Sequence, residues 1–458
     1  MGTATKFNNK SKTKNHQKLP PGKYGPLMHL KLGEVSTIAV SSPLFAKEVL
    51  KNHDPSCADR PETLATKIMW YDFSFCPYGE YWRQMRKICI MELLSSKNVR
   101  SFESIRLEEA SRLVESIRSS SQEVTINLSE KVYFYISSIT CRAVFGKVCS
   151  DPDTLINVLK NAVALAAGFG FADLFPSSKM LNIFNWNKFK LLKMHRKLDS
   201  ILEDIIDEHQ EKSADGSGES GDEDLVDVFL RLKNSRTLEF PIENENIKAI
   251  IFDVFSAGTE TSSTTLDWAM VELMKNPLVM VKAQDEIRQV LKDRKRVNES
   301  DIQTLKYLKL VIKETLRLHP PITLIPRACR EEFEINGYKI PLKAKVMINT
   351  WAMGRNLDIW HRPESFEPER FENNSVDFLG SHFEYIPFGS GRRFCPGMAS
   401  GLATIELILS QLLYHFDWKF PEGISSNDLD MTEAEGLTVS RKENLYLIAK
   451  PYNPSIVD

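Results

Sequence analysis

The sequence predicts a mainly α-helical protein with small β-sheets, that is, an α+β fold. The first observation is that apolar residues recur with the helical period over long stretches, whereas strict alternation covers only two segments. The second is the composition, because 458 residues that are 42% hydrophobic and 26% charged are typical of a soluble globular protein with a large core. The helical period covers Trp82–Ile90, Val99–Ile117, Met194–Gln210, Glu245–Met274, Val279–Leu291, Leu305–Leu318 and Met398–Phe416.

Two segments alternate between apolar and polar residues, as half-buried strands do. Over Tyr24–Val40 the pattern predicts a strand pair that turns at Gly33. Over Glu334–Ile348 it surrounds Asn336-Gly337, a dipeptide that favours a two-residue hairpin turn. We therefore expect small sheets at these two places.

The chain is expected to form one large domain, although its length alone would suggest two or three. Residues 1–18 are polar and basic and are expected to be disordered, whereas residues 19–458 are expected to form the domain. Residues 213–224 are acidic and glycine-rich, which is typical of a flexible surface loop. An interdomain linker is the alternative, but apolar-faced helices on both sides favour a loop inside one unit.

The net charge, the cysteine spacing and the hydropathy of the sequence exclude several classes of protein. The net charge of −2 gives no reason to expect a nucleic-acid partner. The seven cysteines contain no Cys-x-x-Cys pair, so we expect reduced thiols and no zinc site. No segment has the length and hydropathy of a membrane span, and the N-terminus lacks the apolar core of a signal peptide. These features are typical of a protein that faces the cytosol.

The most informative segment is Phe388–Gly397, in which a glycine-containing loop brings two arginines next to Cys395. Pro396 and Gly397 then open a helical segment, so Cys395 is expected at a helix N-terminus. Backbone N–H groups and the helix dipole there favour a thiolate over a thiol. Such a thiolate is a metal ligand or a nucleophile. A lone cysteine is otherwise more often a small buried hydrophobic residue.

Glu314 falls among apolar residues on the helical wheel of Leu305–Leu318, away from the lysines of the same segment. A carboxylate in that position is costly unless it is paired. Arg317, one turn further on, is placed to pair with it. A surface pair worth about 0.2–0.5 kcal/mol is the alternative. The apolar surroundings favour a buried structural clamp with no catalytic role.

The segment Ala257–Ser262 weakens the middle of the long helix predicted over Glu245–Met274. A glycine inside a helix costs about 1 kcal/mol relative to alanine, and the neighbouring hydroxyl groups compete for backbone hydrogen bonds. We expect one of two outcomes. Either a kink admits a small molecule or water, with Thr261 and Glu260 delivering protons, or the helix ends at Gly258.

Trp82 and Arg86 are four residues apart and therefore share one face of a predicted helix. An indole N–H beside a guanidinium group suits a carboxylate or a propionate. A solvated basic face of an amphipathic helix is the alternative.

Together these motifs resemble those of the cytochrome P-450 haem-thiolate monooxygenases, in particular the microsomal plant type and its terpenoid oxidases. The resemblance covers about Leu19 to Pro454. Its most specific part is the Phe-x-x-Gly-x-Arg-x-Cys-x-Gly loop, and three further motifs stand in the expected order. The four motifs fall at Phe388–Gly397, Glu314–Arg317, Pro368–Phe371 and Ala257–Thr261.

The resemblance implies a haem b cofactor (iron protoporphyrin IX) with Cys395 as the axial metal ligand. It also implies proton delivery by Thr261 with Glu260. The residues expected to bind the cofactor are Trp82, Arg86, Arg327, Phe388, Arg393, Cys395 and Gly397. Those expected to form a buried ion-pair network are Glu314, Arg317 and Arg370. The substrate pocket is expected to include Phe252, Phe255, Ala257, Ile322 and Leu437. The segments expected to face the substrate are Leu64–Tyr71, Ala166–Phe171, Asp253–Ala257, Ile322–Ile325 and Glu435–Thr438.

By this resemblance the protein is an oxidoreductase that inserts one atom of dioxygen into a small hydrophobic substrate, a terpenoid or another specialised plant metabolite. Electrons would come from NADPH through a membrane-bound NADPH-cytochrome reductase. The basic residues expected to dock that partner are Arg83, Lys87, Arg392 and Lys97. Ordinary solvated charge is the alternative account of these residues. The resemblance also implies the cytosolic face of the endoplasmic reticulum membrane.

The chain departs from the family pattern in two places. Residues 19–26 run directly from Leu-Pro-Pro-Gly to Lys-Tyr-Gly-Pro, so the resemblance implies that the N-terminal anchor and first helices are missing and that the protein could be soluble. The segment Ala58–Tyr78 is a few residues short, in a loop that normally covers the substrate. Two rival functions follow: a same-fold enzyme that rearranges peroxides without external electrons, and an inactive haem-binding isoform.

Overall fold

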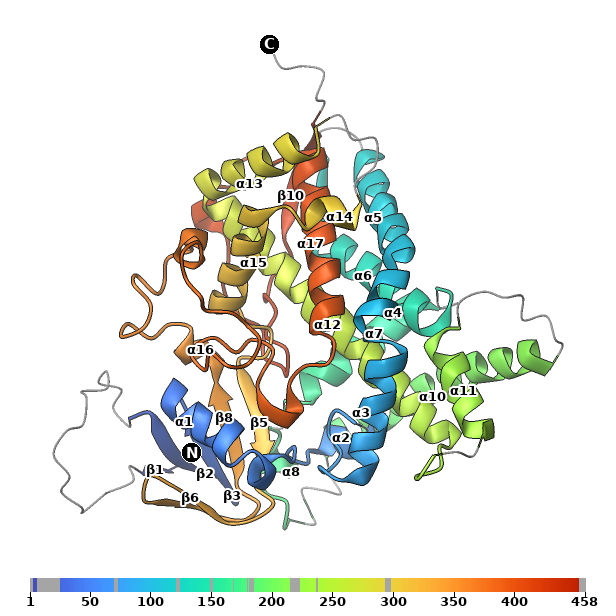
Figure 1. Cartoon of the computed structure of the whole chain (residues 1–458), viewed down its shortest axis with the longest axis vertical. Helices are drawn as coiled ribbons and strands as arrows, with labels where there is room; N and C mark the ends of the chain where they lie inside the picture. Colours follow the sequence, from blue (N-terminus) through green and yellow to red (C-terminus); the bar gives the residue numbers. More distant parts are fainter. Residues whose placement is uncertain are drawn as a thin grey trace.

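The computed structural model describes residues 3–5, 25–69, 73–120, 124–148, 151–167, 169–178, 180, 185–214, 223–235, 238–292 and 298–452. A helical body occupies most of the molecule, and a five-stranded sheet lies at one end of it (Figure 1). The expected α+β fold with small sheets is therefore confirmed.

The larger sheet has the order β1-β2-β3-β8-β5. Its strands are β1 (Thr3–Thr5), β2 (Leu27–Leu32), β3 (Val35–Val40), β8 (Lys345–Asn349) and β5 (Leu324–Ala328). Among these described strands, β3 and β8 alone pair in parallel. The predicted pair β2–β3 turns at Gly33, where φ is +61° and a Cβ would lie 2.3 Å from the Leu174 carbonyl oxygen. Only glycine fits there without a backbone shift.

Two strand predictions need correction. The hairpin around Asn336-Gly337 is present but short, because β6 (Phe333–Ile335) and β7 (Tyr338–Ile340) end early, and β8 joins the larger sheet instead. The expectation of disorder over residues 1–18 is wrong for Thr3–Thr5, whose backbone pairs with the edge of β2. A free strand edge offers unpaired N–H and C=O groups that a further strand satisfies. The rest of that segment lies outside the described residues.

The described helices include all seven predicted segments. The long ones are α3 (Glu80–Glu92), α5 (Glu103–Arg118), α6 (Leu128–Phe145), α7 (Pro152–Leu165), α10 (Trp186–Ala214), α11 (Leu225–Ser235), α12 (Asn244–Lys275), α13 (Pro277–Val290), α15 (Lys306–Leu318) and α17 (Met398–His415). The short ones are α1 (Pro43–Lys47), α2 (Leu64–Ile68), α4 (Ser96–Ser101), α8 (Phe171–Leu174), α14 (Glu299–Ile302) and α16 (Thr350–Met353). A second sheet joins β4 (Thr125–Asn127), β10 (Tyr446–Pro451) and β9 (Phe416–Lys419).

The central helix is α12, which runs unbroken through Gly258, so the alternative of a helix that ends there is wrong. It packs along α6 and also contacts α17, α15 and α10. A Cβ at Gly258 would lie 3.3 Å from Cγ2 of Thr140 on α6, so the glycine allows these two helices to approach closely. Large apolar cores lie around α12. Trp268 on this helix is 1% exposed and stacks on His319, with ring centroids 3.9 Å apart.

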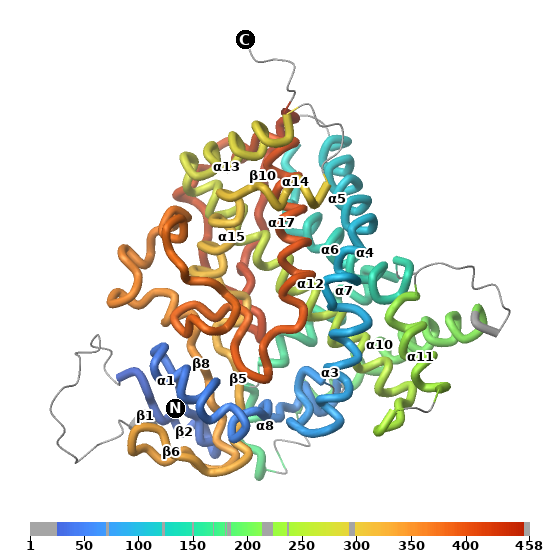
Figure 2. Tube along the Cα trace, in the orientation of Figure 1, coloured from blue at the N-terminus to red at the C-terminus, as the bar shows by residue number. Residues whose placement is uncertain are grey.

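The chain path explains how distant segments meet. Figure 2 shows the C-terminal part passing from the sheet region through the loop at residue 395 and into α17, which lies beside α4 and α5. The predicted acidic loop starts later than expected, because α10 continues to Ala214. Residues 215–222 of that loop lie outside the described residues.

Candidate active site

The loop before α17 is held in shape by its glycines. Gly391 has a φ of +71°, and a Cβ there would lie 2.4 Å from the carbonyl oxygen of Leu50. Gly391–Arg393 form one turn of 3-10 helix, and the N–H of Cys395 then donates to the carbonyl of Phe388 at 3.0 Å. This hydrogen bond closes the loop and presents Cys395 at the N-terminus of α17.

The sulfur of Cys395 faces the interior of the protein. Burial raises the pKa of this thiol, while the N–H groups of Gly397 and Met398 and the charges of Arg86 and Arg60 act in the opposite direction. The N–H groups at the helix N-terminus favour the thiolate, as predicted, but the net effect is a raised pKa. Burial disfavours the charged form more than the dipole supports it. A metal cation on the sulfur reverses this balance.

A cavity of about 370 Å³ lies between the cysteine loop, α12 and α3. This volume is within the usual range for small-molecule sites. The predicted site residues that line it are Trp82, Arg86, Ala257, Glu260, Thr261, Ile322, Phe388, Arg393, Cys395, Gly397 and Leu437. The fold thus brings together residues that are more than 300 positions apart in the sequence.

Several predicted pocket residues do not line this cavity. Phe255 is 1% exposed and packs against Phe145, with ring centroids 6.3 Å apart. It stands roughly 200° around α12 from Asp253 and Ala257, which do line the cavity. Phe252 packs against the same core as Phe255.

Two of the five segments expected to face the substrate lie elsewhere, whereas Asp253–Ala257, Ile322–Ile325 and Glu435–Thr438 each contribute residues to the cavity wall. The described parts of 64–71 and 166–171 do not line the cavity. Phe169 and Phe171 are 49% and 74% exposed on the surface. The conformation of the loop decides which way these two side chains point, and sequence periodicity does not predict it.

Arginine side chains gather beside the cavity. Arg393 donates through Nε to Ala58 O at 2.8 Å and through Nη1 to Phe73 O at 3.0 Å, with its guanidinium 4.6 Å from the ring centroid of Trp82. Arg86 donates to the carbonyl of Phe394 and lies 5.3 Å from the same ring. The indole of Trp82 therefore orders two cations on its faces.

Arg327 is fully buried and only partly satisfied. Its Nη2 donates to Ser390 O at 3.1 Å, but Nε and Nη1 have no hydrogen-bond partner among the described residues. Burial, together with the charges of Arg393 and Arg86, lowers its pKa to about 10. Buried donors of this kind are costly unless a ligand pairs with them.

Arg60 belongs to the same cluster and was missed in the sequence. Its guanidinium donates to Pro326 O at 2.5 Å, and burial lowers its pKa well below the ordinary value, as do Arg327 and Arg393. Arg60 belongs to no recognised motif. It precedes Pro61 in the segment Ala58–Tyr78, which is a few residues shorter than the family pattern. Four neighbouring cations, Arg60, Arg86, Arg327 and Arg393, make this end of the cavity an anion site.

Glu314 is fully buried and fully paired behind the cysteine loop. Its oxygens accept from Nε and Nη2 of Arg317, both at 2.8 Å, and Oε1 also accepts from Nε of Arg370 at 2.9 Å and from the N–H of Glu367 at 2.8 Å. Arg317 in turn donates to the carbonyl of Pro363 at 2.7 Å. This is a buried network and not a surface pair.

Glu260 and Thr261 occupy the cavity-facing turn of α12. Thr261 donates through Oγ1 to Ala257 O at 2.7 Å. Oε2 of Glu260 accepts from the hydroxyl of Tyr133 at 2.7 Å, and burial raises the pKa of this carboxyl. Glu260 also lines a second cavity of about 220 Å³, which Lys160 borders with its Nζ 4.1 Å above the Tyr133 ring. One carboxyl group thus lies between two cavities.

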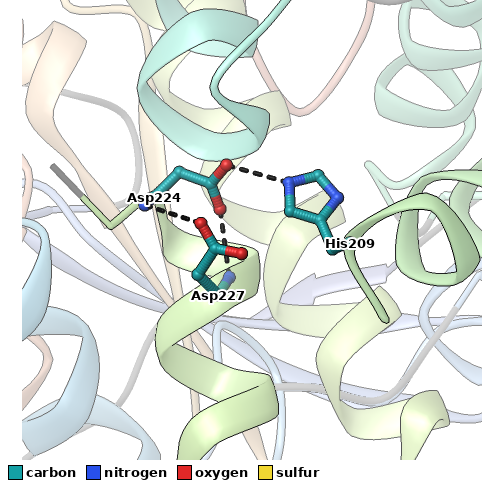
Figure 3. A group of neighbouring side chains, drawn as sticks. All are labelled: His209, Asp224 and Asp227. Atoms are coloured by element: carbon teal, nitrogen blue, oxygen red, sulfur yellow. Dashed lines mark hydrogen bonds and ion pairs between the residues drawn. The ribbon is translucent and has the colours of Figure 1, made fainter. Parts of the chain in front are cut away.

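A separate cluster lies away from the cavity, where α10 meets the start of α11 (Figure 3). Nδ1 of His209 contacts Ile205 O at 2.6 Å, and Nε2 contacts Oδ2 of Asp224 at 2.9 Å. Both partners are hydrogen-bond acceptors, so this arrangement favours the imidazolium form of the ring, in which both nitrogens donate. Burial lowers the pKa of His209, but the hydrogen bond and charge of Asp224, the hydrogen bond to Ile205 O and the charge of Asp227 together outweigh it, so the net shift is upward. Burial and the charge of Asp224 raise the pKa of Asp227.

This cluster predicts a pH dependence of stability. A raised histidine pKa contributes free energy of unfolding that is fully present below the unfolded pKa of about 6.5 and is lost as the pH rises through the folded pKa. Chemical denaturation of the wild type and His209→Gln at several pH values measures this. We expect the difference in unfolding free energy between the two proteins to shrink as the pH rises from about 6 to 9. A difference that stays constant or grows would contradict the ion pair.

Comparison with known proteins now identifies the class. The cytochrome P-450 family model matches residues 1–448, and the chain belongs to the cytochrome P-450 family. It is therefore a monooxygenase, and members of this family bind haem through a cysteine thiolate.

The chain is similar to premnaspirodiene oxygenase from Hyoscyamus muticus, with 57% identity over 94% of this chain and 87% of that protein. It is also similar to 5-epiaristolochene 1,3-dihydroxylase from Nicotiana tabacum, with 56% identity over 94% of this chain and 87% of that protein.

The residues present fit a haem group. The cluster of four arginines, with two unpaired donors on buried Arg327, suits the carboxylates of the propionates. Cys395 offers a thiol inside the same cavity, where a metal would stabilise the thiolate. None of the described helices combines the length and hydropathy that crossing a bilayer requires.

Proposed function

We propose that this monooxygenase inserts one atom of dioxygen into a terpenoid or a similarly apolar plant metabolite, with electrons from NADPH delivered by a flavoprotein reductase. The observation that carries the proposal is the half-buried thiol of Cys395, which lines an apolar cavity that has a cationic cluster at one end. The names of the two relatives, an oxygenase and a dihydroxylase, support the reaction class.

In this proposal Cys395 would supply the thiolate that binds the haem iron. Haem, when bound, supplies the iron centre for dioxygen activation, and electron donation from the thiolate favours O–O cleavage. Arg86, Arg327, Arg393 and Arg60 hold the propionates, while Trp82 orders two of these arginines. Phe388 packs against Phe378 with ring centroids 5.5 Å apart and fixes the start of the loop. The space beside the sulfur of Cys395 is open at Gly397, because a Cβ added to this glycine would only just reach van der Waals contact with the sulfur, at 4.0 Å.

Thr261 and Glu260 are the proposed proton donors. The Thr261 hydroxyl gives its own hydrogen to a backbone carbonyl, which leaves its oxygen free to accept from water in the cavity. Glu260 holds a proton more readily than an exposed carboxyl because its pKa is raised, and Tyr133 fixes its side chain. A proton can thus be held next to the cavity.

Replacing Thr261 by alanine is expected to uncouple electron use from product formation. The cavity and Cys395 stay intact, but the ordered hydroxyl is lost, so electrons leave as hydrogen peroxide. General acid groups contribute about 10²–10⁴-fold, so we expect product per NADPH to fall at least about tenfold. Thr261→Ser, which keeps the hydroxyl, should retain most of the coupling. Equal coupling in the alanine variant and the wild type would remove Thr261 from the mechanism.

The reductase is proposed to dock near the cysteine loop through Arg83, Lys87, Arg392 and Lys97, which are all exposed. Arg83 pairs with Glu80, and Arg392 lies 3.0 Å from Asp54, so part of this charge is already neutralised. Solvated surface charge remains the competing account. A reduction rate that falls steeply with ionic strength supports docking.

Contact with the endoplasmic reticulum membrane, on its cytosolic face, is proposed from exposed apolar side chains. Exposed hydrophobic residues around α8 and the start of α10 are Phe169, Phe171, Phe175, Met180, Trp186 and Phe189. Trp186 is 82% exposed. Aromatic residues exposed in this way are typical of surfaces that enter the lipid interface.

The proposed function is tested with haem-loaded protein and a reductase. We expect a thiolate-type band in the carbon monoxide difference spectrum and NADPH-dependent oxidation of at least one member of a terpenoid panel. Turnover of hydroperoxides without a reductase would instead support the rival function, an enzyme that rearranges peroxides. The hydrogen-bonded pair of Glu260 and Tyr133, next to Thr261, argues against that rival. A spectrum without that band would support the inactive isoform.

A further inference from the structure

A carboxyl group lies in the wall of the otherwise largely apolar cavity. Asp253 stands on α12, two turns before Thr261, and is 9% exposed. Its Oδ2 accepts from the backbone N–H of Ser74 at 3.0 Å. The side chain of Ser74 also hydrogen-bonds to this carboxyl group, and no other described residue does. A carboxylate can accept about four hydrogen bonds, so Ser74 leaves part of this group for a ligand.

No cation among the described residues balances the charge of Asp253. Burial raises its pKa to about 7, and only the hydrogen bonds of Ser74 oppose this shift. The hydroxyl of the neighbouring Ser256 is engaged with the carbonyl of Asp253 at 3.2 Å. A buried carboxyl group without a complete set of partners is unfavourable unless a ligand supplies one.

The surroundings select the kind of partner. Val254, Ala257 and Ile322 line the same cavity and favour a hydrocarbon skeleton. Arg60 and Arg86 also line the cavity and disfavour a cationic ligand such as an amine. A neutral hydroxyl group satisfies both conditions, because it donates to the carboxyl group of Asp253 without bringing a charge.

We propose that Asp253 is a substrate-positioning residue that accepts a hydrogen bond from the hydroxyl group of a terpenoid alcohol. This inference rests on the proposed function. It narrows the proposed substrate class from terpenoids in general to terpenoid alcohols. Asp253 and Thr261 are eight positions apart on one helix, which is about 12 Å along the axis. A rigid polycyclic alcohol held at Asp253 would present its far end to Thr261.

The alcohol has two possible sources. It is either the product of an earlier oxidation by another enzyme or the first product of this enzyme, which is then oxidised again. The chemistry recognised at Asp253 is the same in both cases.

The test compares binding of a terpenoid alcohol with binding of its parent hydrocarbon, through the shift of the haem absorption band on titration of the ferric protein. We expect the wild type to bind the alcohol more tightly. In Asp253→Leu, the ratio of the two dissociation constants should change against the alcohol by about tenfold or more, as for loss of a hydrogen bond to a charged group. Ser256→Ala is the matched control, since its hydroxyl is already engaged, and it should keep the wild-type ratio.

Two outcomes would overturn the proposal. One is a wild type that does not prefer the alcohol. The other is an Asp253→Leu variant in which both affinities fall by the same factor, because that is the result of a purely structural anchor for Ser74. Should the leucine variant bind no ligand, Asp253→Asn replaces it in the comparison. The asparagine keeps an acceptor for the Ser74 N–H but presents an NH2 donor, from which the alcohol oxygen can accept, so a smaller change of the ratio in the same direction is expected from it.

Product analysis separates the two sources of the alcohol. If the enzyme makes its own alcohol, the wild type converts the hydrocarbon to a diol, and Asp253→Leu releases the mono-alcohol. If another enzyme supplies it, only the alcohol is turned over. The thiolate-type band must be present in every variant, so its absence from the wild type marks failure of the proposed function and not of the role of Asp253.

Discussion

Replacing Cys395 by alanine is expected to abolish the thiolate-type band in the carbon monoxide difference spectrum completely. Among the described cysteines, Cys395 is the one whose side chain lines the cavity. Without it the cavity holds the arginine cluster but no thiol for the iron. The measurement is the difference spectrum of purified protein supplied with haem, with far-UV circular dichroism to verify the fold.

Cys57→Ala is the matched control for this experiment. Cys57 is likewise free and is buried, but its sulfur lies 3.7 Å from that of Cys329 and outside the cavity lining. We expect this variant to keep the band. A band that persists in Cys395→Ala, or one that is lost equally in Cys57→Ala, would contradict the assignment. Cys395→Ser provides a second variant if the alanine protein does not fold.

Replacing Glu314 by glutamine is expected to destabilise the fold by about 3–5 kcal/mol. The carboxylate of Glu314 is the shared partner of Arg317 and Arg370. Its neutralisation leaves the buried guanidinium of Arg317 without a counter-charge and leaves Arg370 with Glu367 alone, at 3.5 Å. The free energy of unfolding from chemical denaturation, or the temperature at which haem is released, measures the loss.

Glu62→Gln makes the same chemical change at the surface. Glu62 pairs with Lys67 at 2.8 Å, and both side chains are more than half exposed. Surface pairs of this kind contribute about 0–1 kcal/mol, so this control should stay near wild-type stability. Similar losses in the two variants would show that the network around Glu314 does not act as a buried clamp.

Periodicity predicts the helices that present one apolar face to a core, and it fails for helices that are covered on several sides. The predicted ends of the segment that forms α12 lie within one residue of the observed ones. In contrast, α6 is missed, because it packs against both α12 and α5 and buries Ser137 and Ser138 together with its apolar residues. Its pattern therefore lacks a clear polar face. The segment predicted over Val99–Ile117 breaks at Phe102, which periodicity does not detect.

Site residues can be predicted where they belong to a local sequence motif. They cannot be predicted where contacts with distant segments decide which way a side chain points. Thr261 and Ala257 line the cavity as expected, but Phe255 on the same helix faces the core. The spacing of these residues can be read along the chain, whereas the side of α12 that adjoins the cavity depends on tertiary packing. Arg60 and the contact between Asp253 and Ser74 are missed for the same reason, since the partners lie elsewhere in the chain.

X-ray absorption spectroscopy at the iron edge detects the atoms bonded to the metal, and it therefore shows whether Cys395 is a ligand. For the haem-loaded wild type we predict one sulfur neighbour of the iron, and for Cys395→Ala we predict none. An iron with only nitrogen and oxygen neighbours in the wild type, or a sulfur neighbour that remains in the variant, would contradict ligation by Cys395.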